Sequence, residues 1–117
     1  MMQSYLDLSF RAANLALEQG KRGLANGFLA CPIVTHGPDA RGRLVVTLGC
    51  TGDVEDVFAE YSGDEHDWVA TPAAVSLLRA VWPGEGPAID VVRIVWRHGA
   101  SGLEAGLDDV LQYLWWP

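Results

Sequence analysis

The clearest strand signal in the sequence is the segment Ile89-Asp-Val-Val-Arg-Ile-Val-Trp96. Successive side chains of a strand point to opposite faces of its sheet, so odd-numbered and even-numbered residues of this segment face opposite ways. Both sets are mainly apolar, with Ile89, Val91 and Val95 on one face and Val92, Ile94 and Trp96 on the other. We therefore expect this strand to be covered on both faces.

Two further strands are predicted at residues 28–35 and 43–50, which are rich in Val, Ile, Leu and Thr. A turn-forming stretch, Gly-Pro-Asp-Ala-Arg-Gly, separates them, so the pair should form a hairpin. Pro32 cannot donate a ladder hydrogen bond, which places the first strand at a sheet edge or at a bulge. The hairpin could bring Cys31 and Cys50 together in a disulfide, but we expect two free cysteines that pack as small apolar residues.

Two helices are predicted from capping residues and apolar periodicity. Ser4 is the expected N-cap of the first helix, whose pattern continues to about Gln19. Thr71 followed by Pro72 is a strong helix start, and the second helix should end at Trp82, before a Pro-Gly pair. Its few polar residues indicate that this second helix is mostly interior.

A last helix is predicted near the end of the sequence, where Ser101-Gly-Leu-Glu104 has the spacing of a capping box. Apolar residues recur at helical spacing from Leu103 to Leu114, so this helix is expected to dock on the sheet. Trp115 and Trp116 follow it. We interpret them as candidate anchors for a partner, since tryptophan is common at binding hot spots; the alternative is that they pack onto their own domain.

The acidic residues are concentrated in the segment from Thr51 to Trp68. It holds seven acids and no lysine or arginine, while the rest of the chain carries eight acids and eight bases. The net charge of −7 therefore arises in this segment alone. Its acids are Asp53, Glu55, Asp56, Glu60, Asp64, Glu65 and Asp67.

Part of this acidic segment shows a helical pattern. Asp53 is a plausible N-cap, and apolar residues recur at helical spacing from Val54 to Tyr61. The sequence thus predicts a helix over residues 53–61, with Glu55, Asp56 and Glu60 on its solvent face, followed by an acidic loop at 64–67.

The predicted order of elements is helix, strand, strand, helix, helix, strand, helix. It indicates one domain spanning residues 1–117 in the α+β class. We expect a small, mainly antiparallel sheet of about three strands, packed against helices.

Composition excludes several classes of partner. A chain of 117 residues can bury a core of its own. With a single lysine, Lys21, and a net negative charge, it cannot make many phosphate contacts and would be repelled by anionic lipid, so we expect no direct nucleic-acid or membrane partner. No signal peptide or membrane-length apolar run is evident, and we expect a cytoplasmic protein.

No catalytic constellation or cofactor motif is recognisable in the sequence. Asp64-Glu65-His66-Asp67 offers oxygen and imidazole ligands but lacks the spacing of a calcium loop, so we predict no metal. An enzyme or small-ligand domain with a pocket near Cys50 and His98 is therefore only the alternative prediction.

The function that the sequence favours is that of a small acidic inhibitor. A concentrated negative patch accelerates encounter with a positive groove and competes there with phosphate. We therefore predict that residues 53–67, helped by Trp115 and Trp116, dock into a basic groove of a larger protein. Toxin-immunity proteins and phage inhibitors of nucleases or CRISPR complexes have a similar size and acidity. The alternative partner is a second copy of this chain, in a homodimer formed through the Trp-rich end and an edge strand.

Overall fold

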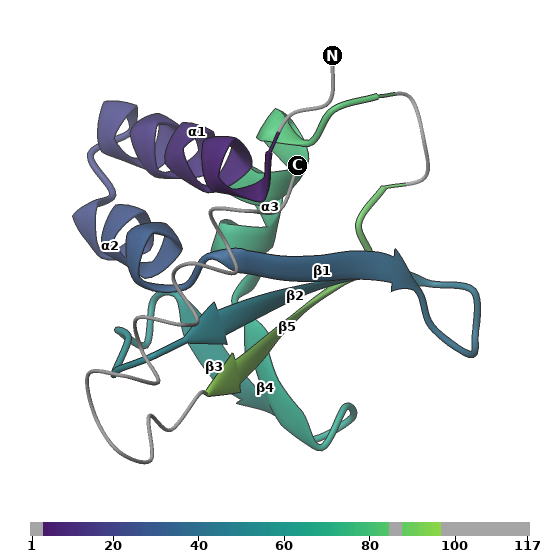
Figure 1. Cartoon of the computed structure of the whole chain (residues 1–117). Coiled ribbons are helices and arrows are strands. Elements are labelled where there is room, and N and C mark those ends of the chain that lie inside the picture. Colours follow the sequence, from purple (N-terminus) through teal and green to yellow (C-terminus); the bar gives the residue numbers. More distant parts are fainter. Residues whose placement is uncertain (1–3, 85–87, 97–117) are drawn as a thin grey trace, which may run out of the picture.

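The computed structural model describes residues 4–84 and 88–96, and within them three helices lie on one face of a five-stranded sheet (Figure 1). The helices are α1 (Tyr5–Glu18), α2 (Arg22–Ala30) and α3 (Pro72–Val81). The strands are β1 (Ile33–Pro38), β2 (Leu44–Cys50), β3 (Ala59–Ser62), β4 (Asp67–Ala70) and β5 (Val91–Trp96). The α+β class is therefore confirmed, but the sheet is larger than predicted.

The sheet is mixed, with the strand order β1-β2-β5-β4-β3. β1 and β2 form the expected antiparallel hairpin, whereas β5 pairs in parallel with β2 and antiparallel with β4. β3 and β4 form a second antiparallel hairpin at the far edge. The prediction of about three mainly antiparallel strands is therefore wrong, because the acidic segment supplies two strands of its own.

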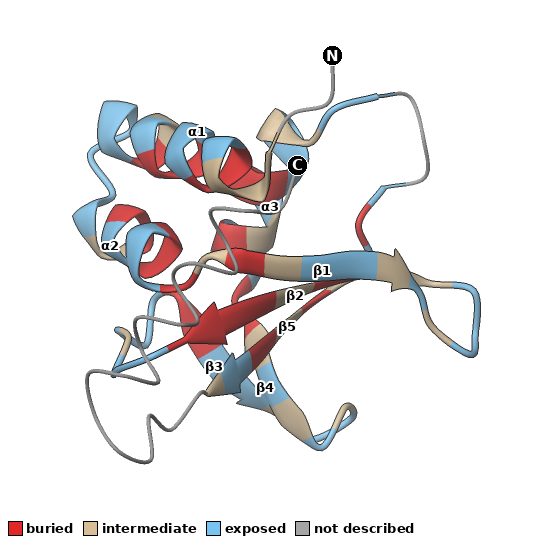
Figure 2. Ribbon diagram, in the orientation of Figure 1, coloured by how far each residue is buried: buried red, intermediate tan, exposed pale blue. Residues whose placement is uncertain are grey.

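The core lies between the sheet and the three helices. Figure 2 shows the sides of α1 and α2 that face the sheet as buried and their outer sides as exposed. The strands contribute fully buried side chains to this core, among them Val46 and Leu48 of β2 and Val92 and Ile94 of β5. These residues are register partners, so their side chains point to the same face. Among the described residues, no helix is long and apolar enough to span a membrane.

Three predicted elements agree closely with the structure. α1 begins after Ser4, whose hydroxyl accepts a hydrogen bond from the Asp7 amide at 3.1 Å. α3 begins after Thr71, with Pro72 in its first turn, and ends before Trp82. β5 occupies the predicted strand segment. The predicted edge position of the first strand is also confirmed, because β1 is an edge strand with an irregular register between Ile33 and Thr35.

The first predicted strand began too early. Residues 28–30 belong to the end of α2, and β1 starts only at Ile33. α2 places Leu24, Ala25 and Phe28 in the core at helical spacing. Two glycines inside α2 weaken that signal in the sequence, because glycine is a poor helix former.

The helix predicted over residues 53–61 is absent; this segment is an irregular connection followed by β3. Phe58 is fully buried and packs edge-on against Phe28 of α2, with ring centroids 5.1 Å apart. The adjacent Ala59 is also buried, in register with Ala70 of β4. Aspartate and valine are weak helix formers, so this packing and the sheet pairing overcome the helical pattern.

Cys31 and Cys50 form a disulfide, contrary to the expectation of two free cysteines. Cys31 follows α2 and Cys50 ends β2, and both are fully buried. Their Cα atoms are 4.3 Å apart. Disulfides persist in oxidising compartments and are rare in the cytosol. The cytoplasmic location stays a prediction, and this bond is an argument against it.

The last predicted helix, from Ser101 to Leu114, lies outside the described residues. The predicted cover on both faces of β5 is shown for one face only, where Val92 and Ile94 meet the helices. On the other face, Val91 is half-buried and Val95 is exposed.

Candidate functional site

The acidic segment follows one edge of the sheet. Asp53, Glu55 and Asp56 lie in the connection between β2 and β3, Glu60 lies on β3, and Asp64 lies in the β3–β4 turn. All five are exposed. Within the described part of the chain, none of the five forms an ion pair. Their charges are therefore available to a partner.

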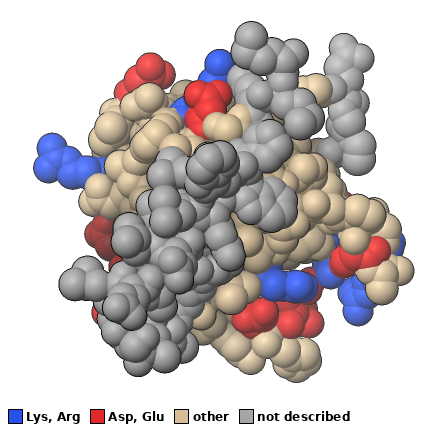
Figure 3. Space-filling model, in the orientation of Figure 1, with Lys and Arg blue, Asp and Glu red and all other residues tan. Residues whose placement is uncertain are grey.

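The other two predicted site acids have a structural role. Glu65 accepts hydrogen bonds from both terminal nitrogens of Arg43, at 2.6 and 3.2 Å, and its side chain is only 19% exposed. Asp67 lies 3.7 Å from Nε of Arg93, and Arg43 also binds Asp39 at 2.8 Å. Figure 3 shows acidic and basic atoms together at the end of the sheet that carries the β1–β2 turn. Glu65 and Asp67 are therefore partly engaged within the fold, and their part in binding a partner stays a prediction.

The hydrogen bonds from Arg43 hold the pKa of Glu65 below its usual value of 4.5. A carboxyl whose pKa is lower in the folded state than in the unfolded state stabilises the fold above the unfolded pKa. That contribution is lost as the pH falls through the folded pKa. The ion pair is partly exposed, so salt should weaken it.

We expect Glu65→Gln to lower the stability of the protein at pH 7 and to flatten its decline on acidification below about pH 4.5. The amide cannot lose a proton, so the acid-dependent contribution of this site disappears. Urea unfolding at a series of pH values measures it. Asp64→Asn, at the exposed neighbouring acid, is the matched control and should retain the native pH profile. Identical profiles for Glu65→Gln and the native protein would contradict this role.

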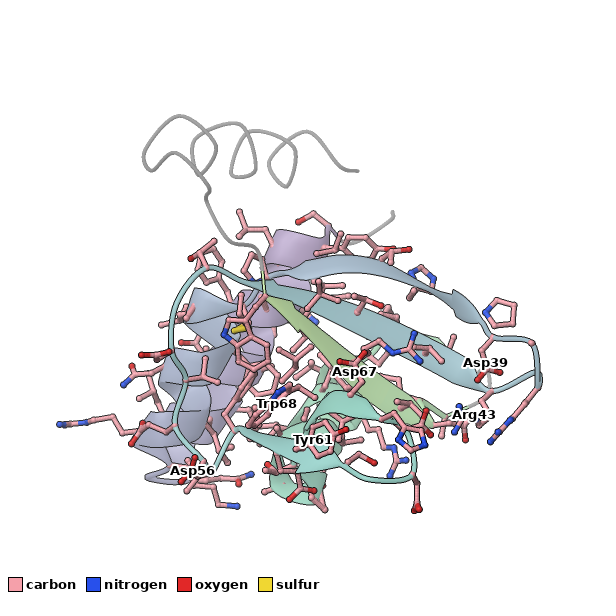
Figure 4. The ribbon with its side chains drawn as sticks, turned by 90° about the horizontal axis from the view of Figure 1, so that it is seen from below. Asp39, Arg43, Asp56, Tyr61, Asp67 and Trp68 are labelled. Atoms are coloured by element: carbon pink, nitrogen blue, oxygen red, sulfur yellow. A yellow bond between two sulfur atoms is a disulfide. The ribbon has the colours of Figure 1, made fainter. Side chains whose placement is uncertain are left out.

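Two exposed aromatic residues lie at the same edge of the sheet as the free acids. Tyr61 of β3 is 58% exposed and Trp68 of β4 is 41% exposed. They are register partners, and their ring centroids are 6.0 Å apart. Figure 4 shows them side by side, with Asp56 toward the end of the sheet opposite to Asp39 and Arg43. We call Tyr61, Trp68 and the five free acids (Asp53, Glu55, Asp56, Glu60 and Asp64) the acidic–aromatic surface. It extends over both faces of this edge of the sheet, because Glu60 precedes Tyr61 on β3 and therefore points to the opposite face.

Sequence reasoning missed the two aromatic members of this surface. It placed Tyr61 on the buried side of a helix and gave Trp68 no role. The available signal was the run Tyr61-Ser-Gly-Asp-Glu-His-Asp-Trp68, in which turn-forming residues are flanked by aromatic residues, as in a hairpin. His66 in this turn has a positive φ of 54°, in the left-handed region that turns often use.

The remaining candidate residues are Trp115, Trp116, His98 and Cys50. Trp115, Trp116 and His98 lie outside the described residues. Cys50 is bonded to Cys31, so it has no free thiol for the alternative enzyme site. Within residues 4–84 and 88–96, no three His, Cys, Asp or Glu side chains gather in a way that could hold a metal ion.

Comparison with known proteins gives no relative from which a function could be carried over. The chain matches no protein-family model, no curated protein and no solved structure.

Proposed function

We propose that the protein is a small acidic inhibitor that docks its acidic–aromatic surface into a basic groove of a larger protein. The observation that carries the proposal is the pairing of Tyr61 and Trp68, both well exposed, with five acids that have no ion pair among the described residues. Such a surface combines apolar anchors with charge of a single sign.

The aromatic pair supports a protein partner. Tyrosine and tryptophan are enriched at interface hot spots because they bury a large area while ordering few rotatable bonds. Tyr61 and Trp68 extend from neighbouring strands of a sheet, and Asp67 beside Trp68 is held by Arg93. The anchors therefore stand on a rigid base, which reduces the entropy lost on binding.

The charge supports a basic partner. The two arginines beside the β3–β4 hairpin, Arg43 and Arg93, are paired with Asp39, Glu65 and Asp67. Within residues 4–84 and 88–96 the five free acids have no ion-pair partner, although Lys21 lines the same hollow as Glu55. A surface of this kind speeds association with a positive groove and opposes contact with nucleic acid, whose phosphates carry the same sign.

The proposal is tested by a pull-down with native and neutralised protein from lysate of the cells in which the protein occurs. The neutralised variant carries amides in place of the five free acids, which takes the net charge from −7 to −2. It leaves Glu65 and Asp67 unchanged, because their ion pairs hold the hairpin. We expect the native protein to retain a basic, nucleic-acid-binding partner at low salt and the neutralised variant to lose it.

A matched control carries the same change in net charge on α1 and α2. Lysine replaces four exposed residues there, adding one charge each at Asn14, Gln19 and Asn26 and two at Glu18. This control should retain the partner, because its acidic–aromatic surface is intact. If the native and neutralised proteins retain the partner equally, the proposed docking is refuted. If the control loses the partner as the neutralised variant does, binding depends on net charge and not on this surface.

A further inference from the structure

A pocket opens at one end of the acidic–aromatic surface. It has a volume of about 290 Å³ and is formed by the β2–β3 connection together with the neighbouring ends of β3, β4 and β5. Two carboxylates and two indole rings dominate its lining, which consists of Asp53, Val54, Asp56, Ala59, Trp68 and Trp96. This volume suits a single side chain or a small organic group better than a large ligand.

The two indole rings form adjoining walls of this pocket. The ring centroids of Trp68 and Trp96 are 5.3 Å apart, and the ring planes are inclined at 70°. The indole N–H of Trp96 donates a hydrogen bond to the carbonyl of Gly52 at 3.0 Å, which fixes that ring against the β2–β3 connection. Tyr61 also contacts Trp68, with the two ring planes inclined at 72°. Rings set nearly at right angles present electron-rich faces in two directions, as aromatic cages for cations do.

The carboxylates give the pocket a negative charge. Asp53 and Asp56 are exposed and form no ion pair within residues 4–84 and 88–96. An anionic ligand would be repelled, and a neutral one could only donate hydrogen bonds to the carboxylates, without the attraction between opposite charges. A cation gains from the carboxylates and from the ring faces together.

From this lining we infer that the pocket receives an arginine side chain of the protein partner, an assignment that rests on the proposed function. The guanidinium group is planar, so it stacks on an indole face while its N–H groups reach carboxylates in a forked arrangement. A lysine ammonium is a compact, strongly hydrated charge that loses more on leaving water. Arginine is also the commoner cation over aromatic rings.

The test is an NMR titration of the full chain with N-acetyl-arginine N-methylamide, following the tryptophan indole N–H signals. Trp68→Phe and Trp96→Phe variants identify which of the five indole signals belong to the pocket. We expect those two signals to shift and saturate with the arginine probe. The citrulline analogue has the same shape without the charge and should shift them far less at the same concentration. The lysine analogue should bind more weakly than the arginine probe.

Paired variants show whether the pocket or the net charge is responsible. Asp53→Asn with Asp56→Asn should weaken binding of the arginine probe about tenfold, since two carboxylate contacts are lost. Asp7→Asn with Glu18→Gln removes two charges from α1, outside the pocket, and should leave the affinity unchanged. Equal shifts with citrulline, equal affinity for lysine, equal weakening by both variants or no saturable shift would each overturn the arginine assignment.

The outcomes separate this site from the docking proposal. If the arginine probe fails while partner capture still depends on the five free acids, the pocket assignment is wrong and the docking proposal stands. If the probe binds as expected but the neutralised variant captures the partner normally, the docking proposal is wrong, and the arginine-binding pocket remains without its assigned partner.

Discussion

Reduction of the Cys31–Cys50 disulfide is expected to lower the free energy of unfolding by about 3 kcal/mol. The two cysteines are 19 residues apart, and the bond limits the freedom of that loop mainly in the unfolded chain. Native domains are stable by only about 5–15 kcal/mol, so the loss is a large fraction of the total. The bond joins the end of α2 to the end of β2 and so ties the helical layer to the sheet.

Urea unfolding with and without dithiothreitol measures this effect. Both cysteines are fully buried, so the reductant can reach the disulfide only when the fold opens. The protein is therefore reduced in denaturant and then refolded before the measurement. A Cys31→Ala, Cys50→Ala variant should unfold at the same midpoint with and without the reductant. Two thiols that react with an alkylating agent in the unreduced, unfolded native chain would show that the bond does not form.

Gly27→Ala is expected to destabilise the protein by about 2 kcal/mol, although alanine is the better helix former by about 0.5–1 kcal/mol. A β-carbon at this position would overlap the ring of Phe58, which is fully buried against Phe28. A well-packed core cannot move such a ring without displacing its neighbours. A lower free energy of unfolding would therefore show that tertiary packing outweighs helix propensity at this position, and a higher one would show the reverse.

Gly23→Ala, one turn earlier on the same helix, is the matched control. Its β-carbon would meet Oε2 of Glu55 at 2.6 Å and Cγ2 of Val57 at 2.7 Å. Both of those side chains are exposed and can move aside, so the free energy of unfolding should change by less than about 1 kcal/mol. If the two variants have equal unfolding midpoints in urea, the close packing of Phe58 on Gly27 is wrong.

The sequence predicts those elements whose signals are local. Ser4 and Thr71 are helix caps that act within one turn, and the alternation of β5 identifies a buried strand without reference to its partners. The edge position of β1 follows from Pro32, which lacks a backbone donor. Each of these signals depends on a few neighbouring residues only, so the predicted element does not change when distant segments pack against it.

The elements that were mispredicted depend on contacts between distant segments. The apolar residues Val54, Val57, Phe58 and Tyr61 have helical spacing. In the fold, however, Phe58 packs in the core against Gly27 and Phe28 of α2. Tyr61 then becomes an exposed strand residue paired with Trp68. Which acids are free and which are ion-paired also depends on distant segments, because Glu65 pairs with Arg43, 22 residues away in the chain. Nothing within the acidic segment distinguishes Glu65 from Asp64.

The most direct measurement of the proposed inhibition is a competition on the captured partner. Labelled nucleic acid is bound to that partner, and its fluorescence anisotropy is followed as native or neutralised protein is added. The native protein should release the nucleic acid, and the neutralised variant should need about 10- to 100-fold more, because it lacks five charge contacts with the groove. A ternary complex in which the native protein binds and the nucleic acid stays bound would contradict docking in the basic groove.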